Sequence, residues 1–208
     1  MASSPGKTAY LILFNAASAV AWAVVLCRTV TIFSVLGPLF VYDGVGVWTK
    51  WTQTLAALEV LHSLLGIVRA PFFTTLMQVS SRFLLVWAIV DRFPFLALSP
   101  AYSSMLVAWS SSEVIRYSYF TLSLSGFAPS FLTWLRYSTF WVFYPIGILS
   151  ECVLIYKASA HCVPLERYTL YAVLAIYVPG SYVLYSHMIA QRRKVMRSLK
   201  AKDDRATR

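Results

Sequence analysis

Tyr144 and Glu151 are the two side chains of this sequence that best fit proton-transfer chemistry. They stand seven residues apart, two helical turns less about 20°, so a continuous helix carries both on one face. Between them Pro145 removes a backbone donor and tends to kink the helix, and Gly147 leaves room against it. This arrangement predicts an acid–base pair on a bent, thinly covered helix. The alternative is a tyrosine at a packing interface and a glutamate paired with a neighbouring arginine.

Five further ionisable residues lie inside apolar runs, namely Glu59, His62, Arg82, Glu113 and Arg116. A charge at the centre of a membrane helix costs about 2.5–3.5 kcal/mol unless it faces protein or water. Glu113 and Arg116 are three residues apart and so share one helical face, which favours an ion pair. His62 follows Glu59 by one turn, so a hydrogen bond between them is expected rather than a metal ligand. We expect Glu59, Arg82, Glu113 and Arg116 to form a supporting polar network.

Neither a metal site nor a phosphatase site is expected. His161 and His187 lack an acidic or cysteine partner at ligand spacing. The stretch 62–69 looks like the phosphate-binding loop of tyrosine phosphatases, but Ser63 stands where the nucleophilic cysteine should be. Phosphocysteine chemistry needs a thiolate, so this reading is rejected.

The composition predicts a membrane protein. Of the 208 residues, 59% are hydrophobic and only 12% are charged, against about 25% charged in soluble domains. A water-soluble monomer is excluded. The net charge is +10, and most of it comes from the stretch 191–208, with eight Lys or Arg and two Asp. A basic end beside apolar runs indicates an anionic membrane surface, and no nucleic acid, as its partner.

Six apolar runs are long enough to cross a membrane, which takes roughly 20 residues. The sequence therefore predicts an all-α polytopic membrane protein with six transmembrane helices in one bundle. Residues 1–190 form this domain and 191–208 a basic cytosolic tail. The first run has no convincing cleavage site and is expected to be a retained anchor. The predicted spans are 9–36, 51–68, 71–90, 101–120, 131–156 and 164–189.

The distribution of Lys and Arg outside the spans predicts the orientation of the chain. An even number of spans puts both termini on one side. That side carries eleven basic residues, namely Lys7, Arg69, Arg136 and the eight of the tail. The other side carries four, namely Lys50, Arg92, Lys157 and Arg167. Because Lys and Arg are enriched in cytoplasmic loops, both termini are expected to be cytosolic.

Ordered motifs extend over nearly the whole chain, from about Tyr10 to Lys194. They are Tyr10-Leu11 with Asn15 and Trp22, Leu58-Glu59-Val60-Leu61-His62 with Gly66, Gln78-Val79-Ser80-Ser81-Arg82, Ala108-Trp109-Ser110 with Glu113-Val114-Ile115-Arg116-Tyr117-Ser118, and Arg136-Tyr137 to Tyr144-Pro145 with Gly147 and Glu151. Taken together, these motifs resemble the membrane 3-hydroxyacyl-CoA dehydratases of very-long-chain fatty acid elongation, formerly labelled protein tyrosine phosphatase-like.

The resemblance implies an activity, a location and partners. Members of this family dehydrate very-long-chain (3R)-3-hydroxyacyl-CoA to trans-2-enoyl-CoA, the third step of the microsomal elongation cycle. They have six spans, reside in the endoplasmic reticulum, and work with elongase, 3-ketoacyl-CoA reductase and enoyl-CoA reductase. The catalytic tyrosine and glutamate of the family map onto Tyr144 and Glu151. No cofactor and no metal is required.

This reaction needs one base and one acid, since it removes a weakly acidic proton from C2 and expels hydroxide from C3. Glu151 can accept the C2 proton. Tyr144 can donate to the departing oxygen, because a phenol with an ordinary pKa of about 10 is protonated at neutral pH. The reverse sharing of protons stays open at this point.

The depth of Tyr144 separates the reacting groups from the phosphates of coenzyme A. Tyr144 lies thirteen residues after Phe131, about 20 Å along a helix at 1.5 Å per residue. We therefore expect the head group to stay at the cytosolic mouth, with the pantetheine arm threading inward and the acyl tail between helices. The basic candidates there are Arg69, Arg136, Arg192, Arg193 and Lys194.

Two other functions compete with the dehydratase reading. One is a catalytically silent membrane scaffold for elongation complexes, against which the presence of both Tyr144 and Glu151 argues. The other is a small-solute transporter, against which the lack of paired halves argues.

Overall fold

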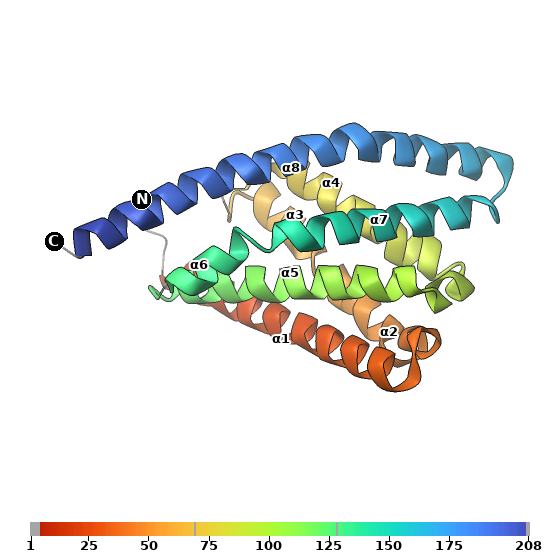
Figure 1. Cartoon of the computed structure of the whole chain (residues 1–208), viewed down its shortest axis with the longest axis horizontal. Helices are drawn as coiled ribbons and strands as arrows, with labels where there is room; N and C mark the ends of the chain where they lie inside the picture. The colour runs from red at the N-terminus through yellow and green to blue at the C-terminus, as the bar shows by residue number, and fades with distance from the viewer. Residues whose placement is uncertain (1–4, 69, 128, 207–208) are drawn as a thin grey trace.

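The computed structural model describes residues 5–68, 70–127 and 129–206, the side chains of 202–206 excepted (Figure 1). Over these ranges the chain is helical and contains no strand, which confirms the all-α prediction. The α-helices are α1 Pro5–Leu36, α2 Val41–Thr54, α3 Ala57–Leu64, α4 Phe72–Phe83, α5 Pro100–Leu124, α6 Ser130–Arg136, α7 Phe140–Ser159 and α8 Pro164–Ala206. Three short segments complete them, the 3₁₀ turns η1 Pro38–Phe40 and η3 Pro94–Leu98 and the π-helical η2 Leu84–Val90.

Glycine and proline mark the principal helix boundaries. Gly37 has a φ of 88°, a left-handed conformation, and its N–H donates to the carbonyls of Ile32 and Phe33. Pro38 follows directly and cannot continue α1, so the chain turns back into α2. Pro100 begins α5 in the first helical position, where its missing N–H costs nothing.

The helix α5 is the centre of the bundle. Its most extensive contacts are with α1 on one side and α7 on the other, and α2 packs against α1. In Figure 1, α5 lies between α1 and α7, and α8 runs along the outer side of α7. The core around α5 is built of fully buried apolar side chains, among them Trp22, Val25, Leu85, Met105, Leu106, Leu154 and Ile155.

The last helix, α8, is the least buried of the long helices and packs mainly on α7. It continues without a break from Pro164 to Ala206, so the predicted boundary between residues 1–190 and 191–208 falls inside one helix. Its C-terminal part projects past the bundle, and it ends on the same side of the molecule as the start of α1 (Figure 1).

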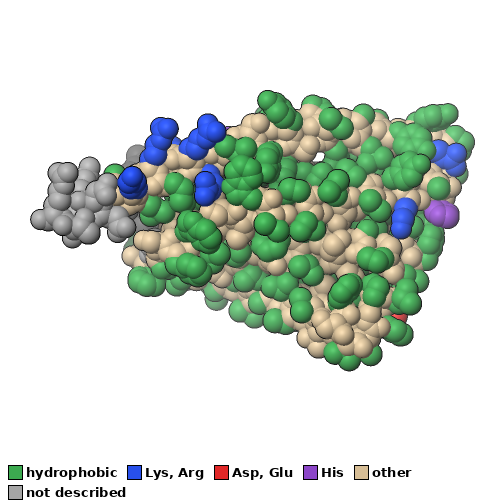
Figure 2. Space-filling view, in the orientation of Figure 1, with side chains coloured by type: hydrophobic (Ala, Val, Ile, Leu, Met, Phe, Trp, Pro, Cys, Tyr) green, Lys and Arg blue, Asp and Glu red, His purple; other side chains and the backbone are tan. Residues whose placement is uncertain are grey.

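Among the described residues, four segments are long and apolar enough to cross a membrane, namely Pro5–Leu36, Phe72–Val90, Ser130–Ser159 and Pro164–Ala201. They match the first, third, fifth and sixth predicted spans. Large apolar side chains cover the outside of the bundle, and Lys and Arg lie near its two ends (Figure 2). The chain is therefore a multi-pass membrane protein.

The second and fourth predicted spans, 51–68 and 101–120, are not among these four segments. The stretch 51–68 is divided between the end of α2, a turn and the short α3, so it is not one continuous helix. The fourth forms α5, which has the required length but carries Glu113 and Arg116 together with many serines. Because α5 is surrounded by other helices, these polar groups face protein rather than lipid. The count of six spans stays a prediction.

Candidate active site

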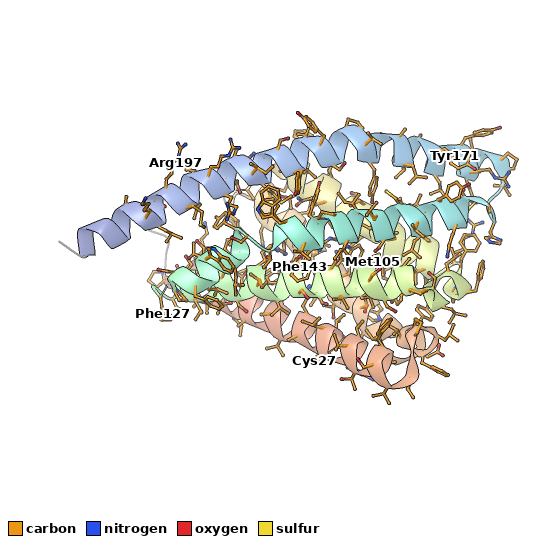
Figure 3. All side chains as sticks on the ribbon, in the orientation of Figure 1. Cys27, Met105, Phe127, Phe143, Tyr171 and Arg197 are labelled. Carbon is orange, nitrogen blue, oxygen red and sulfur yellow. The ribbon has the colours of Figure 1, made fainter. Side chains whose placement is uncertain are left out.

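The helix α7 presents Tyr144 and Glu151 toward α8. It contains Pro145 in its interior, and Gly147 faces α5, where a Cβ would lie 3.8 Å from that of Ala108. The Tyr144 hydroxyl donates to the backbone carbonyl of Ser181 on α8 at 3.2 Å. The residue spacing thus places both functional groups along the α7–α8 interface. Side chains of both helices lie between α7 and α8 (Figure 3).

Both carboxylate oxygens of Glu151 accept a hydrogen bond. The indole Nε1 of Trp109 on α5 donates to Oε1 at 2.8 Å, and the hydroxyl of Tyr177 on α8 donates to Oε2 at 2.8 Å. Glu151 is only 8% exposed and Trp109 only 3%. Among the described residues no arginine forms an ion pair with Glu151, so the alternative of a charge-paired glutamate is wrong.

A stacked ring covers the other functional group. The ring of Tyr144 lies against that of Tyr185 on α8, with centroids 5.6 Å apart and planes 24° from parallel. Tyr144 therefore does pack against a neighbour, as the alternative reading expected. Among the described residues, the Tyr144 hydroxyl forms one hydrogen bond, to the carbonyl oxygen of Ser181. Its proton therefore points at an acceptor.

The four residues of the predicted supporting network lie in one chain of ion pairs across α3, α4 and α5. Glu113 accepts from Arg82 and, at 2.6 Å, from Nε of Arg116. Arg116 also donates two hydrogen bonds to Glu59, at 2.7 and 2.9 Å. Tyr117 donates to the same carboxylate of Glu59. Every member of the network thus has a partner of opposite charge.

Trp109 joins this network to the candidate acid–base pair. The guanidinium of Arg82 lies 5.0 Å from the centroid of the Trp109 ring, the distance of a cation–π contact. The N–H of the same ring donates to Glu151. The ion pairs are therefore separated from the Glu151 carboxylate by a single aromatic ring.

The expected hydrogen bond between His62 and Glu59 is not formed. His62 Nε2 lies 2.8 Å from the hydroxyl of Tyr10 instead, and the edge of Phe14 packs on its ring. Tyr10 on α1 reaches the His62 ring, and the Glu59 carboxylate accepts from Arg116 and Tyr117 on α5.

Two of the basic candidates for the coenzyme A head group, Arg136 at the end of α6 and Arg192 on α8, lie near the turn before α7. The Arg136 guanidinium covers the rings of Tyr119 and Phe120, at 4.7 and 4.2 Å, and its buried Nε has no hydrogen-bond partner among the described residues. The Nε of Arg192 lies 3.5 Å from the Oγ of Ser138, in the turn before α7.

The other three candidates differ in their placement. Arg193 and Lys194 lie on the projecting part of α8, together with Arg197, which Figure 3 labels. Arg69 lies outside the described residues. Over the described ranges, no group of three His, Cys, Asp or Glu side chains is arranged to hold a metal ion.

Sequence reasoning missed Tyr177 altogether. It belongs to none of the motifs, and α8 carries several other tyrosines at similar depth, so its residue type alone carried no signal. Trp109 belonged to a motif but had no role assigned, because an indole N–H can serve any acceptor within reach.

Comparisons with known proteins agree with the motifs. Residues 53–198 match the model of a family described as protein tyrosine phosphatase-like protein, PTPLA. The chain is 41% identical to the probable very-long-chain (3R)-3-hydroxyacyl-CoA dehydratase of Schizosaccharomyces pombe, over 94% of this chain and 97% of the relative. It is 43% identical to the dehydratase PASTICCINO 2A of Oryza sativa subsp. japonica, over 92% and 95% of the two chains.

More distant relatives carry the same name. The very-long-chain (3R)-3-hydroxyacyl-CoA dehydratase 2 of Homo sapiens is 32% identical, over 92% of this chain and 82% of the relative. No solved structure matches the chain. On the family model and on identities that extend over most of each chain, this protein belongs to the very-long-chain (3R)-3-hydroxyacyl-CoA dehydratase family.

Proposed function

We propose that this protein dehydrates very-long-chain (3R)-3-hydroxyacyl-CoA to trans-2-enoyl-CoA, with Glu151 as the base and Tyr144 as the acid. The observation that carries the proposal is a buried carboxylate and a phenol presented from one helix to the same interface inside a membrane bundle. The names of the relatives supply the substrate class.

The hydrogen bonds support this division of roles. Trp109 Nε1 carries a proton and has no lone pair to offer, so a protonated Glu151 would find no acceptor there. Two donors on its two oxygens favour the ionised carboxylate, which is the form that a base requires. Tyr144 donates to the carbonyl of Ser181. In the proposed complex, the C3 oxygen of the substrate replaces this carbonyl as the acceptor of the Tyr144 proton.

In the proposed reaction, Glu151 takes the proton from C2 and the electron pair of that C–H bond forms the C2–C3 double bond. The C3–O bond breaks at the same time or shortly afterwards, and the Tyr144 hydroxyl proton goes to the departing oxygen to give water. The proton on Glu151 must then return to the Tyr144 phenolate before the next turnover. No oxidant or reductant is consumed.

The substrate spans the distance from the basic end of α8 to the buried pair. In the proposed binding mode, the phosphates of coenzyme A contact Arg136, Arg192, Arg193 and Lys194, with Arg69 as a further candidate. The pantetheine arm extends along α7 toward Tyr144, and the acyl tail continues between helices. Arg192 supports this placement, since it already bridges to the turn before α7.

We further propose that the protein resides in the endoplasmic reticulum membrane with both termini cytosolic, beside elongase, 3-ketoacyl-CoA reductase and enoyl-CoA reductase. The excess of Lys and Arg on the side of the termini supports the orientation. In sealed microsomes, protease should cut the C-terminal tail and spare the loop from Lys157 to Arg167. A lumenal tail would overturn this topology.

The activity is tested with the purified protein in lipid nanodiscs and a very-long-chain 3-hydroxyacyl-CoA. We expect trans-2-enoyl-CoA and water, detected by mass spectrometry of the acyl-CoA pool. A correctly folded protein that binds elongase but produces no enoyl-CoA would favour the silent scaffold instead.

A further inference from the structure

Two side chains contact the Glu151 carboxylate directly, and the dehydration as proposed uses neither of them. Trp109 reaches it from α5 and Tyr177 from α8, each at 2.8 Å and each on a different oxygen. Glu151 itself is on α7, which packs between these two helices. The carboxylate is therefore held from both sides by elements that are far apart in sequence.

We infer that Trp109 and Tyr177 are positioning residues that hold the Glu151 carboxylate ionised and aimed at the substrate. This inference rests on the proposed function, because it concerns the same base. It adds two residues to which neither the motifs nor the comparisons assign a role.

The first argument is orientation. A glutamate side chain has three rotatable bonds, and the terminal one is broad, so an unheld carboxylate samples many directions. Hydrogen bonds from opposite sides restrict this freedom before the substrate arrives, and a reacting group fixed near its attack geometry reacts faster. Each carboxylate oxygen has two lone pairs, so one bond per oxygen leaves capacity for the C2 proton.

The second argument is the rigidity of the donors. The Trp109 ring is almost fully buried and rests against the guanidinium of Arg82, which is itself bound to Glu113. Tyr177 is half-buried and lies four residues, about one turn, before Ser181, whose carbonyl accepts from Tyr144. One short stretch of α8 therefore contacts both members of the acid–base pair.

The third argument concerns α8 as a whole. This helix packs mainly on α7, and the bonds of Tyr177 and Ser181 are polar contacts between the two helices at the depth of the site. Loss of the Tyr177 bond would free the carboxylate on its α8 side while the Trp109 bond remains. The expected effect is on turnover, because the coenzyme A head group is bound elsewhere.

The experiment compares Tyr177→Phe and Trp109→Phe with matched controls in nanodiscs. Phenylalanine keeps an aromatic ring and removes the donor. We expect kcat to fall about 10- to 100-fold in each variant with KM nearly unchanged, the range for a hydrogen bond to a charged group. The controls are Tyr182→Phe on α8 and Trp134→Phe on α6. Both side chains are exposed, so these changes should keep kcat within about twofold.

A double-mutant cycle separates positioning from structural damage. If Tyr177 acts only through the carboxylate, Tyr177→Phe should cause no further loss in a Glu151→Gln background, measured on the residual activity. Fully additive losses would overturn the inference. Trp109→His, which keeps a ring N–H, should recover part of the turnover that Trp109→Phe loses. If Trp109→Phe does not fold, Trp109→His replaces it in the comparison with the unmodified protein.

The outcomes distinguish this inference from the proposed function. Turnover at the unmodified rate in both Tyr177→Phe and Trp109→Phe, with Glu151→Gln inactive, would overturn the inference and leave the proposed base in place. An active Glu151→Gln protein would overturn the proposed base, and with it the inference.

Discussion

Two buried carboxylates in neighbouring regions of the bundle have opposite surroundings. Glu113, in the α3–α4–α5 region, is 4% exposed and accepts from two arginines. Glu151, at the α7–α8 interface, is 8% exposed and accepts from an indole and a phenol, both neutral. The two carboxylates are buried to nearly the same extent, so what distinguishes their chemistry is the groups that donate to them. A carboxylate between two fixed cations is a poor proton acceptor, whereas one held by neutral donors can still take up a proton.

The two regions also differ in how tightly they are enclosed. Helix α5, which carries Glu113 and Arg116, is packed on both sides, by α1 and by α7, and its Met105 and Leu106 are fully buried. The α7–α8 interface is covered by one helix that projects past the bundle and has little burial of its own (Figure 1). Glu113 is thus on the more enclosed helix, and the less covered α7–α8 interface can admit a long, flexible substrate.

The largest expected effect is on turnover at the α7–α8 interface. Tyr144→Phe keeps the ring and deletes the proton, and Glu151→Gln keeps the shape and deletes most of the basicity. Either change should lower kcat about 10²–10⁴-fold with normal thermal stability, measured by steady-state kinetics and thermal unfolding. The double variant should lose much less than the product of the two single losses.

A well-folded Tyr144→Phe protein with an unmodified rate would falsify the role of Tyr144 as the acid. The same result for Glu151→Gln would leave the α7–α8 interface without a base.

The next effect is on stability in the α3–α4–α5 region. Glu113→Ala removes the ion-pair partner of Arg82, and Arg116→Ala removes that of Glu59. An unpaired charge inside the bundle can cost about 3–5 kcal/mol. The yield of folded protein and the unfolding midpoint should both fall, and activity should fall with them. Normal folding with abolished activity would move the residue from the scaffold to the catalytic machinery and erase the contrast with Glu151.

A smaller effect is expected on substrate affinity. Combined neutralisation of Arg192, Arg193 and Lys194 should raise KM roughly 3- to 10-fold and leave kcat nearly unchanged, because each exposed charge contributes modestly. The rise should be larger at low salt, where screening is weaker. Lys157→Gln, at the opposite end of α7, is the control. An unchanged KM in the triple variant would exclude this part of α8 from head-group binding.

The smallest effect is expected at the partly exposed ion pair of Lys50 and Asp91, whose atoms lie 2.6 Å apart. Lys50→Gln should change the free energy of unfolding by only about 0–1 kcal/mol and leave turnover intact. The measurement is chemical or thermal unfolding of Lys50→Gln, with the Glu113→Ala protein measured in parallel. A loss as large as that of Glu113→Ala would contradict the view that burial separates structural from marginal ion pairs here.

Local patterns predicted much of this protein. The apolar runs predicted helices, four of which match segments able to cross a membrane. The interval between Tyr144 and Glu151 predicted a shared helical face, and both side chains do point to α8. Helical periodicity depends only on nearby residues, which is why these inferences needed no partner helix.

Two local predictions were wrong where contacts outside the local sequence pattern decided the structure. The stretch 51–68 was predicted as one span, yet it breaks after α2, and apolar content alone could not reveal the turn at Leu55 and Ala56. His62 was predicted to bond Glu59, one turn away on the same helix, yet it bonds Tyr10 on α1. A competing hydrogen-bond partner on another helix decided that outcome, and local spacing contains no information about it.

The sequence by itself determined the all-α membrane character, the placement of Tyr144 and Glu151 on one helix, and the basic end of the chain, because composition and periodicity act through neighbouring residues. Only the tertiary structure decided which groups contact each carboxylate. Arg116 and Glu59 are separated by 57 positions, and Trp109 and Glu151 by 42. Whether a buried glutamate faces a guanidinium or an indole depends on which helices pack together, and that packing minimises the cost of buried charge over the whole bundle rather than along any one helix.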